Sequence, residues 1–332
     1  MRWSLVGAAV VLAMATPALA SAGLPLGLLS SPTTTSTTTT TTTTTAPVGS
    51  ATTAASSSTA APTCGGQSTL VADRVTWTCT FDSEFDGTGY DTSAWTALTT
   101  ANSGFTQAGV CYEDDPGTVS VGRGYLSLTV RKLAQPFVCS SPAGSFVTSY
   151  VGGFLTTYQK FSQTYGRFEV VAKVPPATVA GLQSSLWLYP ESLSQDSEGG
   201  TTAEIDMAEW YSKYPDREVP YIHYDASSTN SGSTGVNAVT NTNCIIDQSA
   251  FNDYVVEWTP TTITMIYNGT TCLQDQWSPA SPEVAPQPFD EPFFVNLTQA
   301  LGIGANAVGA TTPLPATTEI KSVRVWQGNF SG

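Results

Sequence analysis

Apolar and polar residues alternate strictly along several segments of this chain. The alternation covers residues 126–131, 168–174 and 263–267, with apolar side chains at every second position. A period of two is typical of a β-strand that buries one face, so these segments predict half-buried strands. The last segment runs directly into Asn268-Gly269. Both positions of a type I′ turn need positive φ, which this pair tolerates, and a β-hairpin is therefore expected there.

Turn-forming residues separate the alternating segments at short intervals. They gather at 86–87, 116–117, 152–153, 194–200, 227–235 and 279–288. No long stretch has a helical period, and no internal repeat is present. Many short strands without intervening helices favour an antiparallel sandwich or barrel over a parallel α/β fold.

The first residues have the pattern of an export signal. Arg2 precedes an apolar run over residues 5–15, and small residues at 18–20 suit cleavage. We therefore interpret residues 1–20 as a signal peptide, because the run is shorter than the roughly 20 apolar residues that span a bilayer. The protein is expected to be secreted or displayed at the cell surface, with no membrane span.

Residues 21–63 form a second compositional region, which from residue 30 onward is almost entirely Thr, Ser, Ala and Pro. Such a segment cannot bury a core, so we predict a disordered linker. A flexible spacer and an O-glycosylated stalk are both open interpretations.

Residues 64–332 are predicted to form one all-β domain, which is long enough to build a sizeable core. The full chain of 332 residues carries 12 basic and 26 acidic residues, a formal charge of −14. Nucleic acid is therefore not an expected partner, because binding to phosphates depends on basic patches. The protein is expected to act as a monomer.

The six cysteines also indicate an oxidising compartment. An even number in an exported chain predicts three disulfides, and sequence alone allows 15 pairings. We prefer the pairs formed by sequential neighbours, because each closes a short loop. These pairs are Cys64 with Cys79, Cys111 with Cys139, and Cys244 with Cys272. A zinc site is disfavoured, since no C-x-x-C spacing occurs and the chain has one histidine.

The segment 202–210 places Glu204, Asp206 and Glu209 within six residues. Glu204 and Asp206 are two positions apart and share one face of a strand, but Glu209 has the opposite parity. One extra residue near Met207 or Ala208 would form a β-bulge and return Glu209 to the face of Glu204. The same bulge would return Trp210 to the core.

Hydrolysis of a glycosidic bond needs two carboxylates. One attacks or stabilises the anomeric carbon, and the other donates a proton to the departing oxygen. Asp206, between Glu204 and Glu209, can help to separate the protonation states of that pair. A solvated strand face and a calcium loop are the alternatives, although calcium loops usually carry Gly and Asn among their acids. Spacing does not fix the distance between the carboxylates, so the stereochemical outcome stays open.

The bulged E-I-D-M-A-E segment resembles glycoside hydrolase family 16, in its endo-β-1,3-glucanase branch. The resemblance extends from about Phe81 to Gln327 through further landmarks in the same order. They are F-D-S-E-F-D-G at 81–87 with Trp95, T-Y-G-R-F-E at 164–169 with A-K-V-P at 172–175, L-W-L-Y-P at 186–190, E-W-T-P at 257–260, F-D-E-P-F at 289–293 and V-R-V-W at 323–326.

This resemblance implies a jelly-roll β-sandwich of two antiparallel sheets, with a concave sheet forming the substrate cleft. It also implies a retaining mechanism with Glu204 as the nucleophile, Asp206 as the assisting acid and Glu209 as the general acid/base. His223 lies in a segment that resembles the family's strand after the catalytic one, which often presents a histidine to the cleft. It is therefore expected to bind the substrate or to support a residue that does, and a purely structural role is the alternative. Trp187 is either a sugar platform on the cleft floor or a core residue.

No cofactor or metal is expected, although some relatives carry calcium on the outer sheet and a site near Glu84 is an open alternative. The expected partner is a polysaccharide: β-1,3-glucan first, mixed-linkage glucan second, and a galactan third because no basic motif for sulfate is evident. Segments 175–183 and 296–302 depart from the family's usual sequence and would border the cleft. These departures concern the substrate more than the reaction.

Other functions are distinguishable in part. A serine or cysteine hydrolase lacks a G-x-S-x-G elbow and has only His223 as a base. A non-catalytic carbohydrate-binding module on the same fold would not need both Glu204 and Glu209. A transglycosylase would keep both acids, and sequence does not separate it from a hydrolase.

Overall fold

The computed structural model describes residues 61–72, 74–193, 203–225 and 238–330. The expected signal peptide over residues 1–20, and the expected linker up to residue 60, lie outside the described residues. Within those described ranges, no helix is long and apolar enough to cross a membrane. Strands dominate the fold, and regular helix is limited to the short α1 (Thr100–Ser103) and the 3₁₀ turn η1 (Gly304–Asn306) among the described residues.

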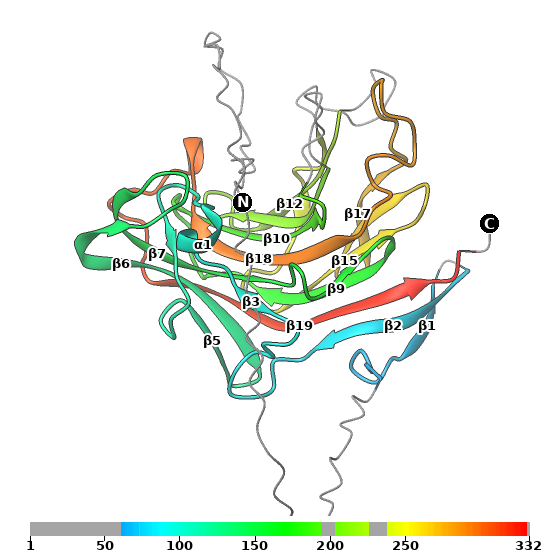
Figure 1. Ribbon diagram of the computed structural model, residues 1–332, viewed down its shortest axis with the longest axis horizontal. Coiled ribbons are helices and arrows are strands. Elements are labelled where there is room, and N and C mark those ends of the chain that lie inside the picture. The colour runs from blue at the N-terminus through cyan, green and yellow to red at the C-terminus, as the bar shows by residue number, and fades with distance from the viewer. Residues whose placement is uncertain (1–60, 73, 194–202, 226–237, 331–332) are drawn as a thin grey trace, which may run out of the picture. The chain divides into compact units, whose positions relative to one another are not determined.

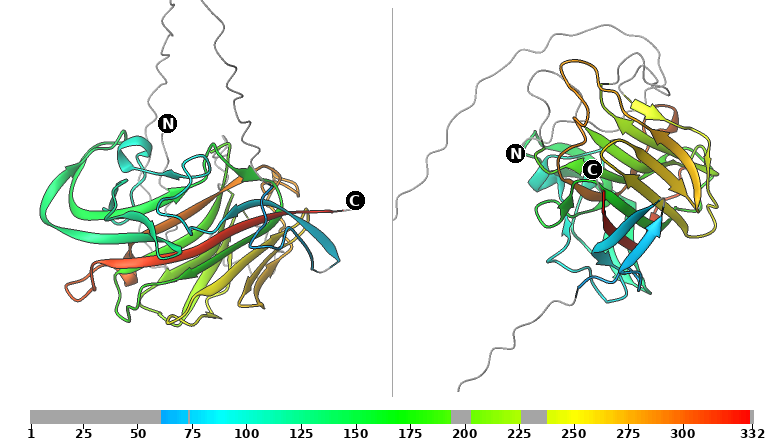
Figure 2. Two further views of the ribbon diagram at one scale, coloured as in Figure 1. Left: turned by 90° about the horizontal axis from the view of Figure 1, so that it is seen from below. Right: turned by 90° about the vertical axis from the view of Figure 1, so that its right-hand side faces the viewer.

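Two layers of antiparallel strands face one another (Figures 1 and 2). In the first sheet the order is β17-β16-β15-β9-β19. Beyond β9, different parts of β19 pair with β2 and with β6. β2 then pairs with β1, and β6 pairs with β5. Its strands are β1 (Thr69–Ala72), β2 (Val75–Ser83), β5 (Val119–Gly122), β6 (Tyr125–Cys139), β9 (Gly166–Lys173), β15 (Asn252–Trp258), β16 (Ile263–Tyr267), β17 (Thr270–Asp275) and β19 (Ala316–Gly328).

In the second sheet the central order is β12-β11-β10-β18-β7. β13 and β14 pair with β12, β3 pairs with β7, and β8 pairs with β18. Its strands are β3 (Thr96–Ala97), β7 (Phe146–Thr156), β8 (Ser162–Gln163), β10 (Leu182–Pro190), β11 (Glu204–Tyr211), β12 (Arg217–His223), β13 (Ala238–Thr240), β14 (Cys244–Ile245) and β18 (Phe293–Leu301).

The long β6 connects the two layers. Its first half pairs with β5 and β19 in the first sheet, and its second half pairs with β7. The two-residue strand β4 (Cys111–Tyr112) lies beside β7 in a parallel pairing, whereas every other pairing among the described strands is antiparallel. The prediction of an all-β antiparallel sandwich is confirmed.

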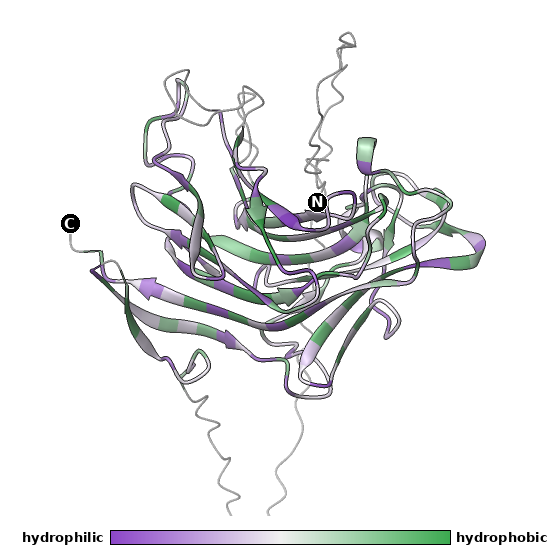
Figure 3. Ribbon diagram, turned by 180° about the vertical axis from the view of Figure 1, so that it is seen from behind, coloured by the Kyte–Doolittle hydropathy of each residue, from purple (hydrophilic) through white to green (hydrophobic). Residues whose placement is uncertain are grey.

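The alternating segments are the half-buried strands that the sequence predicts. Leu126, Leu128 and Val130 are fully buried, while the residues between them are partly exposed. Strand β9 has the same buried and half-buried alternation. Figure 3 shows the resulting alternating bands of apolar and polar residues along the strands. One large core forms between the sheets because both turn their apolar faces inward.

The predicted hairpin and disulfides are also present. Asn268 and Gly269 join β16 to β17 with φ values of 50° and 76°, as a type I′ turn requires. Each cysteine pairs with its sequential neighbour, with Cα–Cα distances of 5.9, 5.9 and 5.6 Å for the 64–79, 111–139 and 244–272 pairs.

Candidate active site

The three clustered acids lie on β11, and a β-bulge interrupts this strand. Towards β10, Asp206 lies opposite Trp187 and Ala208 lies opposite Leu186, so Met207 is the extra residue. The pairing with β12 shifts over the same interval, between Asp206 and Glu209. The bulge predicted from the parity of the acids is therefore present at the predicted place.

With the bulge, the acids lie on one face of β11 and the core residues lie on the other. Ile205 and Trp210 are fully buried in the core between the sheets, which confirms the prediction for Trp210. Directly paired residues project from the same face of a sheet. Asp206 thus shares a face with Trp187, and Glu204 shares it with His223, its partner on β12. Glu209 returns to this face across the bulge.

Glu209 is held by three side chains of the second sheet. Its Oε1 accepts hydrogen bonds from Gln183 Nε2 at 2.8 Å and from Ser185 Oγ at 3.2 Å. Its Oε2 accepts a hydrogen bond from the hydroxyl of Tyr211. Burial, followed by the charge of Asp206, raises the pKa of Glu209 well above its ordinary value, and the three hydrogen bonds offset only part of this rise. A carboxyl group in this environment retains its proton at a pH where an exposed glutamate loses it.

Glu204 is buried beside the other two acids. Its Oε2 has no hydrogen-bond partner among the described residues. Burial is the largest cause that raises its pKa well above the ordinary value, and the charges of Asp206 and Glu209 add to it. Ionising one of the two buried glutamates therefore disfavours ionising the other. The site can hold one carboxyl group protonated while another is ionised.

His223 reaches this cluster from β12. Its Nε2 lies 3.0 Å from Asp206 Oδ2, although the two groups are not aligned as a hydrogen bond. Its ring stacks on that of Tyr221, with centroids 5.4 Å apart and an angle of 21° between the ring planes. The histidine is therefore beside the acids, on the strand that follows the catalytic one.

These side chains also form the one cluster of possible metal ligands found among the described residues. Glu204, Asp206 and His223 each contribute a ligand atom, and these atoms lie within 4.8 Å of one another. Two carboxylates and an imidazole suit a divalent cation such as Zn²⁺ or Mn²⁺ in their donor types. The expected absence of a metal stays a prediction.

Trp187 lies across the strand pair from Asp206 and is packed on its other side by aromatic rings. Its Nε1 donates a hydrogen bond to Thr298 Oγ1 at 2.8 Å. Its ring stacks on Phe105, with centroids 6.2 Å apart, and also contacts Phe154. The side chain is 6% exposed, so only a small part of the indole is available to a ligand.

Several polar residues of this face are not predicted from the sequence. Gln183, Ser185 and Tyr211 bind Glu209, and Asn296 is fully buried opposite Trp187 with neither its Oδ1 nor its Nδ2 hydrogen-bonded within the described ranges. The two-residue period of a strand could have identified some of them. Gln183 and Ser185 stand four and two positions before Trp187, and Tyr211 stands two after Glu209. Gln183 and Asn296 belong to the two segments that depart from the family's usual sequence, and both segments do reach this face.

Glu84, the residue near which calcium is the open alternative, binds an arginine in the described fold. The two carboxylate oxygens of Glu84 accept hydrogen bonds from Arg324 Nε and Nη2, at 2.7 and 2.9 Å. Such a bidentate ion pair already neutralises the charge of the carboxylate. A calcium ion there would have to compete with the guanidinium.

Comparison with known proteins places this geometry in context. The sequence profile of Glycosyl hydrolases family 16 matches residues 106–297. A glucan endo-1,3-beta-glucosidase A1 of Niallia circulans is 29% identical over 272 residues, covering 74% of this chain and 37% of the relative. A keratan-sulfate endo-1,4-beta-galactosidase of Sphingobacterium multivorum is 30% identical over 189 residues, covering 56% of this chain and 42% of the relative. The chain thus spans about two fifths of the length of these relatives.

The fold has close counterparts among solved structures. The laminarinase from Rhodothermus marinus superposes with a TM-score of 0.62 at 24% identity, covering 77% of this chain and 99% of that one. This similarity supports the jelly-roll form of the sandwich.

Proposed function

Because the chain belongs to glycosyl hydrolases family 16 and is a glycoside hydrolase, we propose that it cleaves β-1,3-linked glucan internally by a retaining mechanism. The observation that carries the proposal is the bulge of β11. It brings Glu209 back to the face of Glu204 and leaves Asp206 between them on that face. Two buried carboxyl groups with different hydrogen-bond surroundings suit an acid and a nucleophile.

In the first step Glu204 acts as the nucleophile. Its carboxylate oxygen bonds to the anomeric carbon as the bond from that carbon to the leaving sugar oxygen breaks. Glu209 donates its proton to this oxygen, and its raised pKa keeps that proton available. In the second step the carboxylate of Glu209 takes a proton from water, the water oxygen bonds to the anomeric carbon, and Glu204 is released.

The neighbouring residues support these two steps. Gln183, Ser185 and Tyr211 fix the orientation of Glu209 through both carboxylate oxygens. The charge on Asp206 acts on the protonation of both glutamates, and His223 lies against Asp206. Trp187 and His223 are assigned to the substrate side of the site because both are paired with acids across the strand.

The choice of β-1,3-glucan follows the relative that aligns over 74% of this chain, which is a glucan endo-1,3-beta-glucosidase by name. The relative named as a galactosidase makes a galactan the alternative substrate. Three disulfides suit an oxidising environment, and we propose that the protein acts after secretion.

The test is the release of reducing ends from laminarin, lichenan and agarose by the purified protein, with Glu204→Gln as the inactive counterpart. We expect oligosaccharides from laminarin, initially in the β-anomeric form, and none with the variant. Release from agarose alone would reject the glucan. Binding to laminarin without any release would instead make the protein a carbohydrate-binding module, and products longer than the substrate would make it a transglycosylase.

A further inference from the structure

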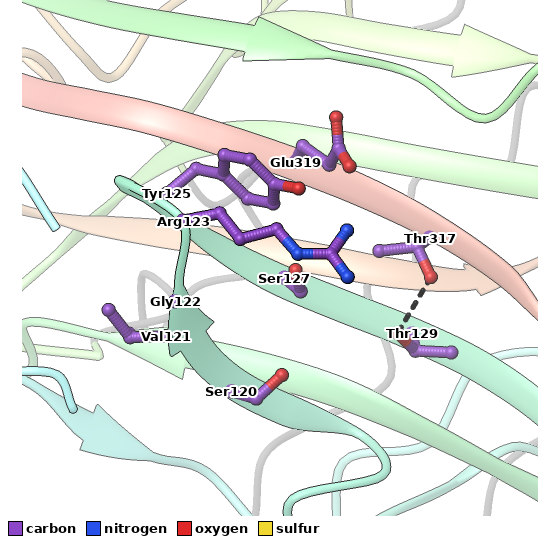
Figure 4. Close-up of a pocket in the computed structure, with 9 residues that line it drawn as sticks. All are labelled: Ser120, Val121, Gly122, Arg123, Tyr125, Ser127, Thr129, Thr317 and Glu319. Atoms are coloured by element: carbon purple, nitrogen blue, oxygen red, sulfur yellow. Dashed lines mark hydrogen bonds between the residues drawn. The ribbon is translucent and has the colours of Figure 1, made fainter. Parts of the chain in front are cut away.

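The first sheet carries a hollow on the face that points away from the core. Strands β5, β6 and β19 line this groove, which has a volume of about 410 Å³ (Figure 4). The acids lie on the other sheet, on β11. Because successive residues of a strand point to opposite faces, the groove residues of β6 alternate with the core residues Leu126 and Leu128. The hollow is thus separate from the candidate active site.

Hydroxyl groups form the floor of this groove. Ser120 and Ser127 pair across β5 and β6, and Thr129 pairs with Thr317 across β6 and β19. The hydroxyls of Thr129 and Thr317 are hydrogen-bonded to each other at 2.8 Å (Figure 4). Small side chains at these facing positions leave room between the longer side chains at the rim. They also offer hydroxyls, which act as donors and as acceptors.

An aromatic pair stands at one end of the groove. Tyr125 lines it, and the Tyr125 ring lies 6.2 Å from the ring of Phe251, measured between centroids. Phe251 is 37% exposed, so part of its ring is accessible to solvent. Aromatic rings with one accessible face can pack against the apolar face of a sugar ring while their edges remain hydrated.

Two charged side chains also line the groove. Arg123 and Glu319 make no hydrogen bond or ion pair to the described residues, and Figure 4 shows the Arg123 side chain extended across the hollow. An arginine offers five donors in a planar fork, and a carboxylate offers acceptors only. Charges of both signs, unpaired and beside hydroxyls, suit a neutral ligand that is rich in hydroxyl groups.

The backbone at Arg123 is unusual for this residue type. Arg123 and Gly124 form a two-residue turn between Gly122 and Tyr125, with φ values of 61° and 80°. Such a type I′ turn favours Asn, Asp or Gly at its first position, whereas other side chains are strained at positive φ. An arginine at this position lowers local stability and places a guanidinium over the groove. Strained residues of this kind tend to occur where they serve a function.

From these features we propose that the groove is a second, non-catalytic binding site for a neutral β-glucan chain. Tyr125 and Phe251 stack against sugar rings, and Arg123 and Glu319 bind sugar hydroxyls. The glucan is thus held on the first sheet, whereas the acids lie on the second. The identity of the ligand as the polysaccharide substrate rests on the proposed function. The groove itself is independent of that assignment.

Binding to insoluble β-1,3-glucan, measured by sedimentation of the full chain, tests this site. Tyr125→Ala removes the ring, and Arg123→Asn replaces the guanidinium with a residue that suits the turn. We expect each variant to bind with a dissociation constant about five- to tenfold higher, as loss of an interface anchor typically produces. Tyr125→Phe keeps the ring and is expected to bind within about twofold of the unaltered protein.

Two further measurements separate the possible failures. Hydrolysis of a short soluble β-1,3-linked oligosaccharide depends on the candidate active site alone and should be unchanged in all three variants; if the unaltered protein does not cleave it, the proposed function fails. The thermal midpoint of Arg123→Asn should equal or exceed that of the unaltered protein, which excludes misfolding as the cause of weak binding. Unchanged sedimentation of Tyr125→Ala and Arg123→Asn would overturn the second site, as would an unaltered protein that does not bind the glucan.

Discussion

Tyr267 donates a hydrogen bond from its hydroxyl to the backbone carbonyl of Met207, at 2.6 Å. Met207 is the extra residue of the bulge in β11, whereas Tyr267 ends β16 in the opposite sheet. A bulge interrupts the regular ladder, so its carbonyl needs a partner from elsewhere. The core of the sandwich thus supplies the contact that holds the bulge, and with it the position of Glu209.

Tyr267→Phe is expected to lower kcat on laminarin by about tenfold with little change in KM, because small displacements of a catalytic group are costly. The buried carbonyl of Met207 would lose its partner, which destabilises the fold by about 1–3 kcal/mol. Steady-state kinetics and thermal unfolding measure both effects.

Tyr254→Phe is the matched control for this variant. Tyr254 is also buried between the sheets, but its hydroxyl donates its hydrogen bond to Glu218 and not to the bulge. We expect a loss of stability with kcat retained. A Tyr267→Phe enzyme that is as active as the Tyr254→Phe enzyme would show that the bulge does not need this contact.

Much of this fold and part of the site follow from local pattern. Alternation predicts β6, β9 and β16, Asn268-Gly269 predicts the hairpin, and the mismatched parity of Glu209 predicts the bulge. Each of these inferences uses residues that are neighbours along one strand or one turn.

Contacts between distant segments could not be predicted in the same way. Gln183 reaches Glu209 only in the register in which β10 pairs with the bulged strand, and Tyr267 reaches Met207 only when the two sheets pack. The pattern of a single strand does not specify its partner or its register. The groove over β5, β6 and β19 has the same origin, since its floor joins residues almost 200 positions apart, such as Thr129 and Thr317.

The assignment of Glu209 as the acid predicts a dependence on the leaving group. Glu209→Gln should lower kcat on laminarin by about 10²–10⁴-fold, since it removes general acid/base catalysis. On an activated aryl β-glucoside oligomer, whose leaving group needs no proton, formation of the glycosyl-enzyme should be much less affected. Burst kinetics of aryl alcohol release measure this step.

Glu204→Gln is the comparison for that experiment. Without its nucleophile, the enzyme should fail on both substrates and show no burst. Equal impairment of both variants on the activated substrate would contradict the separate roles of Glu204 and Glu209.

The hydrogen bond from Tyr211 to Glu209 is expected to influence the pH above which activity is lost. Its hydrogen bond to Glu209 favours the ionised carboxylate and therefore lowers the pKa, against the larger rise caused by burial. Tyr211→Phe removes this bond, so the pKa of Glu209 should rise further. The alkaline limb of the kcat/KM profile, where the acid loses its proton, should then move to higher pH. A shift of this limb to lower pH would contradict the role of Glu209 as the acid.

Chelation tests the expectation that catalysis needs no metal. Glu204, Asp206 and His223 are close enough to share a cation, so the geometry alone permits one. In the two-carboxylate mechanism these acids act directly, and dialysis against EDTA should leave laminarin hydrolysis unchanged. Loss of activity that is restored by one divalent cation would replace this mechanism. A rise in the thermal midpoint with calcium, without any effect on activity, would instead support a structural calcium site.

The burial of Glu218 predicts how the stability of the fold depends on pH. It is fully buried between the sheets, and burial raises its pKa from the ordinary 4.5 to about 8, against a smaller opposing effect of the hydrogen bond from Tyr254. The folded state therefore binds this proton more strongly than the unfolded state. The resulting stabilisation is complete below about pH 4.5 and is lost as the pH rises through about 8.

Glu218→Gln keeps the shape and the neutral state of the protonated acid at every pH. The variant should match the unaltered protein at pH 5 and exceed its thermal midpoint by about 5 °C or more at pH 9. The difference between the two proteins isolates Glu218 from the active-site acids, which titrate in both. A difference that does not grow between pH 5 and pH 9 would mean that Glu218 is already ionised in the fold. The interface between the sheets would then have to solvate a charge that no described cation accompanies.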